Sequence, residues 1–477
     1  MRTDLYVGGA WAPAAAGRRF PVENPATEEI LGRVAEAGAE DVDAAVRAAR
    51  ACFESDGWRK LEPRRRGQML TRAGDLLESR AEEFARLETQ QNGKPFFESK
   101  IDVAMTVETL RYYGGWADKI TGATLPVGEA SFVYTLKEPV GVVGAIVPWN
   151  FPLNLACWKF APALAAGCTV VLKPASETPL TALLMAEVME AAGFPAGAFN
   201  VVAGDGRTTG AALVRHPAVD KIAFTGSTAV GQGIMREAAA SSKRITLELG
   251  GKSPNVVFAD ADISAAVKGA QNAIFYGKGE VCAAGSRLVV ERSVHDQVVE
   301  QLAARAKRLV PGDPFDKATR LGAVVSKQQQ ETVLGYIAKG KSEGAALVAG
   351  GNAATVNGKG HFVEATIFDA VKPEMTIARE EIFGPVLAVL AFDDLEEGIA
   401  LANQSMYGLA AGIWTRDLSK AHRVARAIKA GTVWVNTYNV YDSSAPFGGY
   451  KASGFGRDLG REGLDGYLET KTVWIGL

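Results

Sequence analysis

Short apolar runs alternate with helical segments through most of this 477-residue sequence, and this alternation constrains the fold more than any other feature. Five such runs lie in the first half, at residues 140–147, 168–172, 199–202, 222–224 and 245–249. Each is followed by Pro, Gly or a helical stretch, as strands buried on both faces of a parallel sheet require. The pattern predicts an α/β architecture with parallel sheets.

A second block with the same alternation begins after Gly251. We expect helices at residues 265–276 and 418–430, the latter closed by Gly431, and strands at residues 288–290, 386–391 and 432–435. Near the N-terminus, Asp41 is predicted to cap a helix that begins at Val42. Two α/β blocks joined near Gly251 predict a cleft between two domains.

Four polar or glycine residues stand at or just past the ends of apolar runs in the first block: Asn150, Lys173, Gly226 and Glu248. In a doubly wound sheet the carboxyl ends of the parallel strands share one edge, and ligands bind there. Turn residues commonly follow strands, which accounts for Gly226 but not for a lysine and a glutamate. The four positions are therefore expected to converge on one crevice.

Cys282 stands among small residues in the run Gly-Glu-Val-Cys-Ala-Ala-Gly-Ser (279–286). A lone cysteine is most often a small buried hydrophobe. Its thiolate is nevertheless a strong nucleophile, and such small neighbours would let a substrate carbon approach it. Glu248, in the run Leu-Glu-Leu-Gly-Gly-Lys-Ser-Pro (247–254), could activate water to hydrolyse a thioester. The two residues belong to different blocks, so they are expected to meet at the cleft.

The composition is that of an ordinary globular protein, with 47% hydrophobic and 22% charged residues and a formal net charge of −2. This balance gives no electrostatic support for binding nucleic acid or an anionic membrane. The most apolar stretch, 140–172, is interrupted by prolines and by Lys159, so it does not predict a membrane span. The four cysteines and four histidines lack metal-like spacing, and the first residues lack the apolar core of a signal peptide. A cytoplasmic protein without a metal is expected.

Seven short segments, taken in order, resemble the aldehyde dehydrogenase superfamily, and the resemblance covers nearly the whole chain. They are Pro-Trp-Asn-Phe-Pro (148–152), Lys-Pro-Ala-Ser (173–176), Phe-Thr-Gly-Ser-Thr (224–228), the glutamate and cysteine runs, Glu-Ile-Phe-Gly-Pro (381–385) and Pro-Phe-Gly-Gly-Tyr-Lys-Ala-Ser-Gly (446–454). One such match would carry little weight, whereas seven in order make coincidence negligible. The run 110–119 also looks like the broad-specificity branch, so the resemblance implies the NAD(P)-dependent, hydrolytic, broad-specificity type.

The fold implied by the resemblance has three parts. They are a Rossmann-like dinucleotide-binding domain (1–119 and 139–250), an α/β catalytic domain (251–450) and a small β oligomerisation flap (120–138 and 466–477). In the family such a flap joins subunits, so a homodimer or homotetramer is expected.

The resemblance also implies a site for NAD or NADP. Its expected residues are Ile146, Trp149, Lys173, Ser176, Gly206, Arg207, Phe224, Gly226, Ser227, Glu381 and Phe383. Lys173 matches the family lysine that binds the adenosine ribose. NAD-selective members often carry glutamate at the position of Ser176, and serine removes the repulsion of a 2′-phosphate. Arg207 could pair with that phosphate or be an exposed loop cation, so the preference stays open.

The catalytic residues implied by the resemblance are Cys282, Glu248, Asn150 and Lys173. Cys282 would attack a small-molecule aldehyde, and the Asn150 amide and the Cys282 N–H would stabilise the oxyanion. Hydride transfer would leave a thioester, which Glu248 would hydrolyse by activating water. Relatives that form acyl-coenzyme A tend to lack this glutamate. Glutamine is commoner than glutamate at position 280, and the effect of Glu280 on the Cys282 pKa stays open.

Five residues match positions that line the family's aldehyde tunnel: Phe151, Leu155, Trp158, Tyr441 and Phe447. They suggest an apolar substrate, either an aromatic or a medium-chain aldehyde, although five such residues could equally be core. None of the matched positions carries an arginine, which disfavours substrates with a second carboxylate.

Two other functions stay open at the level of the sequence. A cysteine acyl hydrolase would need a histidine base, and His216, His295, His361 and His422 have no signature context. A catalytically silent structural or binding protein on the same fold would be expected to lack Cys282 or Glu248, and both are present.

Overall fold

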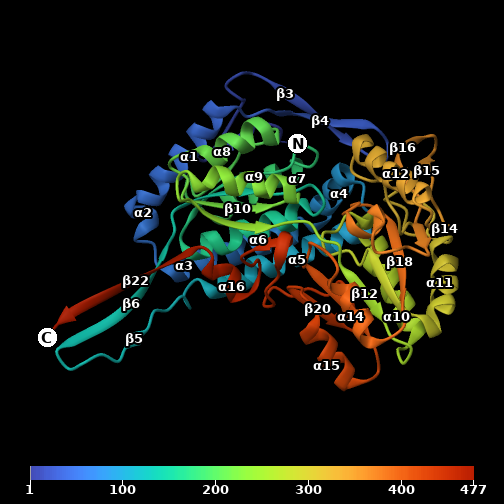
Figure 1. Ribbon diagram of the computed structural model, residues 1–477. Helices are drawn as coiled ribbons and strands as arrows, with labels where there is room; N and C mark the ends of the chain where they lie inside the picture. The colour runs from blue at the N-terminus through green and yellow to red at the C-terminus, as the bar shows by residue number, and fades with distance from the viewer. Residues whose placement is uncertain (1) are drawn as a thin grey trace.

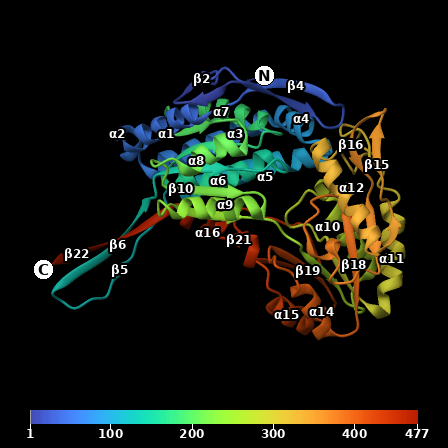
Figure 2. The same cartoon turned by 45° about the horizontal axis from the view of Figure 1, so that its top comes forward.

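Two sheets of mostly parallel strands organise the chain, and the computed structural model describes residues 2–477 (Figures 1 and 2). The expected α/β architecture with parallel sheets is confirmed. The helices are α1 (Ala39–Glu54), α2 (Asp56–Arg59), α3 (Pro63–Ser79), α4 (Ala81–Asn92), α5 (Phe96–Trp116), α6 (Pro152–Ala166), α7 (Leu180–Ala192), α8 (Ala211–Arg215), α9 (Thr228–Ala239), α10 (Ile263–Phe275), α11 (Arg292–Ala306), α12 (Lys327–Ser342), α13 (Thr376–Arg379), α14 (Leu395–Asn403), α15 (Leu418–Ala427) and α16 (Gly460–Asp465).

The first sheet has eight strands in the order β2-β1-β9-β8-β7-β10-β11-β21. Their bounds are β1 (Leu5–Val7), β2 (Ala10–Ala12), β7 (Val142–Ile146), β8 (Thr169–Lys173), β9 (Phe199–Val201), β10 (Lys221–Thr225), β11 (Arg244–Glu248) and β21 (Gly454–Phe455). The five strands from β9 to β11 are parallel and lie at the five apolar runs expected from the sequence. Helices α6 and α7 pack on one face and α1, α8 and α9 on the other, so both faces are buried.

The second sheet has seven strands in the order β14-β17-β18-β13-β12-β19-β20. Their bounds are β12 (Pro254–Val257), β13 (Arg287–Glu291), β14 (Ala346–Ala349), β17 (Thr366–Asp369), β18 (Val386–Phe392), β19 (Ala410–Trp414) and β20 (Thr432–Val435). All neighbours are parallel except β14 and β17. Two further strand pairs are β3 (Arg19–Asn24) with β4 (Glu29–Ala35) and β15 (Ala353–Val356) with β16 (Lys359–Val363).

A three-stranded antiparallel sheet projects from the body of the protein (Figures 1 and 2). It consists of β5 (Thr124–Leu125), β6 (Ser131–Pro139) and β22 (Leu468–Gly476). Strands β6 and β22 pair from Leu468 opposite Pro139 to Gly476 opposite Ser131. This projecting sheet lies where the oligomerisation flap is expected.

Two expectations about helix ends are wrong. Helix α1 begins at Ala39, with Gly38 as its N-cap, and Asp41 lies one turn further on, where its carboxylate accepts the Gly38 N–H at 2.8 Å. Helix α15 ends at Ala427, and Gly431 does not close it. The N–H of Gly431 donates instead to the carbonyls of Gly408 and Leu409, because the chain there turns straight into β20. Among residues 2–477, no helix is both long and apolar enough to cross a membrane.

Candidate active site

The carboxyl ends of four parallel strands meet along one edge of the first sheet, as expected. Ile146 at the end of β7 lies opposite Lys173 on one side and Phe224 on the other, and Thr225 lies opposite Glu248. Asn150 follows in the loop between β7 and α6. The strand register therefore brings the predicted polar positions to one edge.

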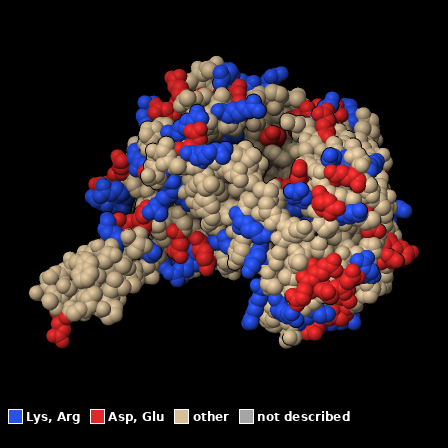
Figure 3. Space-filling view, viewed as in Figure 1, with Lys and Arg blue, Asp and Glu red and all other residues tan. Residues whose placement is uncertain are grey.

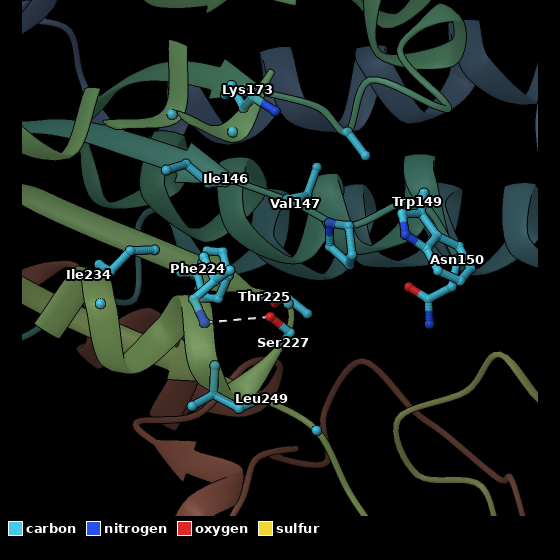
Figure 4. Close-up of a pocket in the computed structure, with 18 of the residues that line it drawn as sticks. Ile146, Val147, Trp149, Asn150, Lys173, Phe224, Thr225, Ser227, Ile234 and Leu249 are labelled. Atoms are coloured by element: carbon cyan, nitrogen blue, oxygen red, sulfur yellow. Dashed lines mark hydrogen bonds between the residues drawn. The ribbon is translucent and has the colours of Figure 1, made fainter. Parts of the chain in front are cut away.

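A cavity of about 900 Å³ opens along this edge, a size suited to a bound small molecule. Asn150 and Cys282 line this cavity. All of the predicted cofactor residues line it as well: Ile146, Trp149, Lys173, Ser176, Gly206, Arg207, Phe224, Gly226, Ser227, Glu381 and Phe383. In Figure 4, Lys173 lies at the top of the view, with Phe224 and Ser227 between it and Leu249, and Asn150 lies to the right of them. Glu248 does not line it.

The turn between β10 and α9 lies at the middle of the cavity. The hydroxyl of Ser227 accepts the Val230 N–H at 3.5 Å and caps α9 (Figure 4). The hydroxyl of Thr225, which lines the cavity, is buried and has no partner among the described residues. A helix N-terminus with free N–H groups and an unpaired hydroxyl suits the pyrophosphate of a dinucleotide. The donor set of this turn therefore fits NAD or NADP.

The end of the cavity near Lys173 carries charges of both signs, because Lys173, Arg207 and Glu177 all line it. Burial lowers the pKa of Lys173 to about 8, although Glu177 and Asp205 oppose this shift. Ser176 is partly exposed and Arg207 is exposed, and both line the cavity. No glutamate occupies position 176, so repulsion of a phosphate by that side chain is absent.

The opposite end of the cavity brings Glu381 close to the strand that carries Glu248. The carboxylate of Glu381 accepts the Gly251 N–H at 2.9 Å, and burial raises its pKa to about 7. Phe383 packs edge-on against Trp149, with 5.2 Å between the ring centroids. This end has one carboxylate and two aromatic rings, which is consistent with the ribose and ring contacts expected of Glu381 and Phe383.

Cys282 and Asn150 lie on loops that are joined directly. The Asn150 amide donates to the Glu280 carbonyl at 2.8 Å and does not cap α6, so one amide hydrogen remains free. A Cβ at Gly251 would stand 2.3 Å from the Cys282 carbonyl, so only glycine lets the loop after β11 approach the Cys282 loop. Burial, and after it the carboxylates of Glu248 and Glu381, raises the pKa of Cys282 well above its usual range.

Glu248 is buried behind the cavity, and one of its carboxylate oxygens has no partner among the described residues. Burial raises its pKa well above the usual range; Asp458 adds to this shift and Lys159 opposes it. Its backbone carbonyl accepts the Gly226 N–H at 3.1 Å. The surroundings of Glu248 thus disfavour its charged form, and its backbone is bonded to the cofactor turn.

The five residues predicted to line an aldehyde tunnel pack around the same hydrophobic cluster as Cys282. Ring centroids of Trp158 and Phe447 are 5.6 Å apart, and those of Tyr441 and Phe447 are 5.5 Å apart. Leu155, Trp158 and Phe447 are almost inaccessible in this conformation, whereas Phe151 and Tyr441 are partly exposed. None of the five lines the large cavity.

Comparison with known proteins identifies the family. The model named "Aldehyde dehydrogenase family" matches residues 11–473. The chain belongs to the aldehyde dehydrogenase family. It is 50% identical over 475 residues to a mitochondrial aldehyde dehydrogenase of Mesocricetus auratus, covering 99% of this chain and 95% of the relative.

Solved structures of the family superpose over the whole chain. An NAD+ complex of aldehyde dehydrogenase from Bacillus cereus is 49% identical, with a TM-score of 0.99 and coverage of 100% and 97%. An indole-3-acetaldehyde dehydrogenase complexed with NAD+ is 47% identical, with a TM-score of 0.98 and coverage of 99% and 96%. The predicted class, an NAD(P)-dependent aldehyde dehydrogenase that forms an acid, is thereby confirmed.

Two residues of this aldehyde dehydrogenase site were not predicted from the sequence. Lys159 forms a buried ion pair with Asp458, and both act on the pKa of Glu248. A lysine inside the otherwise apolar helix α6 could have indicated a buried ionic partner.

Among the described residues, no group of three or more His, Cys, Asp or Glu side chains could hold a metal.

Glu280 points away from the thiol. Its carboxylate forms an ion pair with Lys278 at 2.8 Å and accepts the Val325 N–H at 3.0 Å. The largest causes of the raised Cys282 pKa are burial and the carboxylates of Glu248 and Glu381. The direct partners of the Glu280 carboxylate are therefore Lys278 and the Val325 N–H.

Proposed function

We propose that this aldehyde dehydrogenase acts through Cys282 as nucleophile, Asn150 as oxyanion donor and Glu248 as the base for hydrolysis. The observation that carries the proposal is the placement of Cys282 on the wall of the dinucleotide cavity, on a loop bonded to the Asn150 amide. Lys173 contributes to catalysis by holding the cofactor at the far end of the cavity.

The chain's own groups account for each step. The Cys282 sulfur attacks the carbonyl carbon, and the free Asn150 N–H and the Cys282 N–H stabilise the oxyanion. When bound, the nicotinamide supplies the hydride acceptor. Water then attacks the resulting thioester while Glu248 takes one of its protons; the C–S bond breaks, Glu248 passes the proton to the departing sulfur, and the carboxylic acid leaves with the thiol restored.

The nucleophile is tested by Cys282→Ala. We expect aldehyde oxidation, measured as nicotinamide reduction at 340 nm, to fall to background while dinucleotide binding stays within about twofold, because the sulfur makes no predicted cofactor contact. Cys52→Ala is the matched control, since Cys52 is buried on α1. Turnover in Cys282→Ala at the rate of the control would refute the assignment.

We propose that the adenosine pocket accepts both NAD and NADP. Serine at position 176 cannot repel a 2′-phosphate, and Arg207 stands at the rim of the same cavity. Ser176→Glu should lower kcat/KM for NADP roughly 10- to 100-fold more than for NAD, as expected when a charged contact is opposed. Arg207→Ala should weaken NADP selectively. A parent enzyme that ignores NADP would exclude the open pocket.

For the substrate, we propose an apolar aldehyde, aromatic or of medium chain length. The support is the aromatic cluster beside Cys282, formed by Phe151, Trp158, Tyr441 and Phe447. A structural neighbour is named for the aromatic substrate indole-3-acetaldehyde. The proposal predicts higher kcat/KM for benzaldehyde and hexanal than for acetaldehyde or an aldehyde with a second carboxylate.

We also propose a homodimer or homotetramer assembled through the projecting sheet, and a cytoplasmic location. The projecting sheet exposes large apolar side chains, among them Phe132, Trp474 and Ile475. In Figure 3 its visible surface carries almost no charge except at the tip. Four free cysteines suit a reducing compartment.

A further inference from the structure

Three consecutive residues before Cys282 adopt left-handed backbone conformations. The φ angles of Gly277, Lys278 and Gly279 are +58°, +62° and +72°. Glycine adopts this region freely, whereas lysine is strained there. The Lys278 side chain is also 1% exposed, which is unfavourable for an ammonium group without partners. Specific contacts must hold Lys278 in this position.

Those contacts lead to the end of helix α4. The Lys278 ammonium donates to the Asn92 carbonyl at 2.8 Å and to the Asn92 side-chain oxygen at 2.7 Å. It also forms the ion pair with Glu280 at 2.8 Å. Because both acceptors belong to Asn92, the ammonium fixes which end of the Asn92 amide is the acceptor and which is the donor.

The donor end of Asn92 reaches the loop that carries the oxyanion donor. Its amide nitrogen donates to the Trp149 carbonyl at 2.8 Å, and the Asn150 carbonyl lies at 3.5 Å. The Asn150 side chain in turn donates to the Glu280 carbonyl. The contacts close a ring that runs from Lys278 to Asn92, to Asn150, to Glu280 and back.

Each lysine of this region has its own carboxylate partner. Lys94 pairs with Asp102 at 2.5 Å, as Lys278 pairs with Glu280, and all four are buried. Two further buried carboxyls lie nearby: Glu98 accepts the Gly277 N–H at 3.2 Å, and Glu88 lies beside Lys94. Burial raises the pKa of Glu98 to about 8 and also raises that of Glu88, so their charged forms are disfavoured.

We propose that Lys278 is a positioning residue for the oxyanion hole, which through Asn92 holds the Asn150 amide at a fixed place relative to the Cys282 loop. The inference rests on the proposed roles of Cys282 and Asn150. Displacement of an aligned group by about 1 Å can slow a reaction about 100-fold, so loss of this ring should act on the step that develops the oxyanion.

The test compares two variants that differ only at Lys278. Glu280→Gln is the reference, because it removes the partner charge and avoids leaving an unpaired carboxylate when the lysine is lost. Adding Lys278→Met removes the ammonium and keeps an unbranched chain. We expect the burst rate of acyl-enzyme formation to fall roughly 10- to 100-fold relative to the reference. Dinucleotide affinity should stay within about threefold, whereas deacylation should slow as well, because water attack on the thioester also forms an oxyanion.

Alkylation of Cys282 by iodoacetamide separates positioning from general loosening. This displacement forms no oxyanion, so its rate should stay within about threefold while aldehyde attack slows. Equal acylation rates in the two variants, or parallel loss of acylation and alkylation, would overturn the inference. If the double variant does not fold, Asn92→Ser breaks the same ring from the other side and should give the same contrast.

A remote lysine provides the control for loss of an ion pair. Lys420 on α15 pairs with Asp260 at 2.7 Å, and Lys420→Met should leave acylation unchanged. The Cys282→Ala result separates the two proposals. Activity in that variant would refute the nucleophile, whereas an inactive Cys282→Ala with an unimpaired Lys278 variant would refute only the positioning role.

Discussion

The surroundings of Glu248 disfavour its charged form, and this sets the expected pH dependence of the enzyme. Burial raises its pKa, so the carboxylate that acts as base becomes more abundant as pH rises above the ordinary range of a glutamate. We expect the deacylation rate to increase with pH for this reason. Glu248→Gln should abolish this dependence and let acyl-enzyme accumulate, as seen by mass spectrometry of the intact protein. Rapid formation of acyl-coenzyme A or unimpaired turnover in Glu248→Gln would exclude the role as base.

The same carboxyl should reduce stability. A carboxyl with a raised folded pKa makes the folded state bind more protons than the unfolded state, so the free energy of unfolding falls as pH rises above the ordinary value. Glu248→Gln should therefore raise that free energy, by about 0.5–2 kcal/mol at pH 8 and by less at pH 5. Thermal unfolding at both pH values tests this, and equal effects would contradict it.

Individual site residues could be predicted from the sequence where they follow an apolar run that forms a strand. Lys173 and Glu248 follow apolar runs, and the cavity and strand register place them at the same edge. Asn92 and Lys278 could not be found in this way, because their partnership joins positions 186 residues apart in the chain. Such contacts become visible only when α4 and the Cys282 loop are packed together.

At the scale of elements, the turn Tyr276–Gly279 should not tolerate a side chain at Gly279. A Cβ at Gly279 would stand 2.2 Å from the Gly384 carbonyl, and φ there is +72°. Gly279→Ala should lower the free energy of unfolding by roughly 1–3 kcal/mol and impair acylation. Gly335→Ala on α12 is the control, since nothing lies within 4 Å, and it should stabilise by up to about 1 kcal/mol. Equal effects would contradict this.

Strand positions were easier to predict than helix ends. The apolar runs correspond to parallel strands because burial on both faces demands continuous apolar residues. The start of α1 was misplaced because a local capping contact decides it, and the end of α15 was misplaced because a tertiary contact does. Gly38 uses the Asp41 carboxylate as its acceptor, and Gly431 lies where a side chain would meet the Gly448 carbonyl at 1.6 Å.

For the whole molecule, the projecting sheet predicts self-association. Phe132 and Ile475 are cross-strand partners, exposed by 45% and 44%. Phe132→Glu with Ile475→Lys keeps an attractive pair across the strands while removing the apolar surface. We expect light scattering to show the mass of a monomer. Leu418→Lys, at an exposed apolar position on α15, should leave the mass unchanged. A parent protein that is monomeric would refute the assembly.

Strand β21 gives the enzyme a particular order of maturation. Gly454 pairs with Glu248, so a segment near the end of the chain forms one edge of the eight-stranded sheet. The other edge is formed by β2, near the start of the chain. During synthesis the N-terminal domain generally folds first, but this sheet cannot be finished until residue 455 has left the ribosome. The nascent chain can therefore form its dinucleotide cavity earlier than it can fix Glu248. A polypeptide cut short before β21 would keep its nucleophile and lack the support of the base that releases the product.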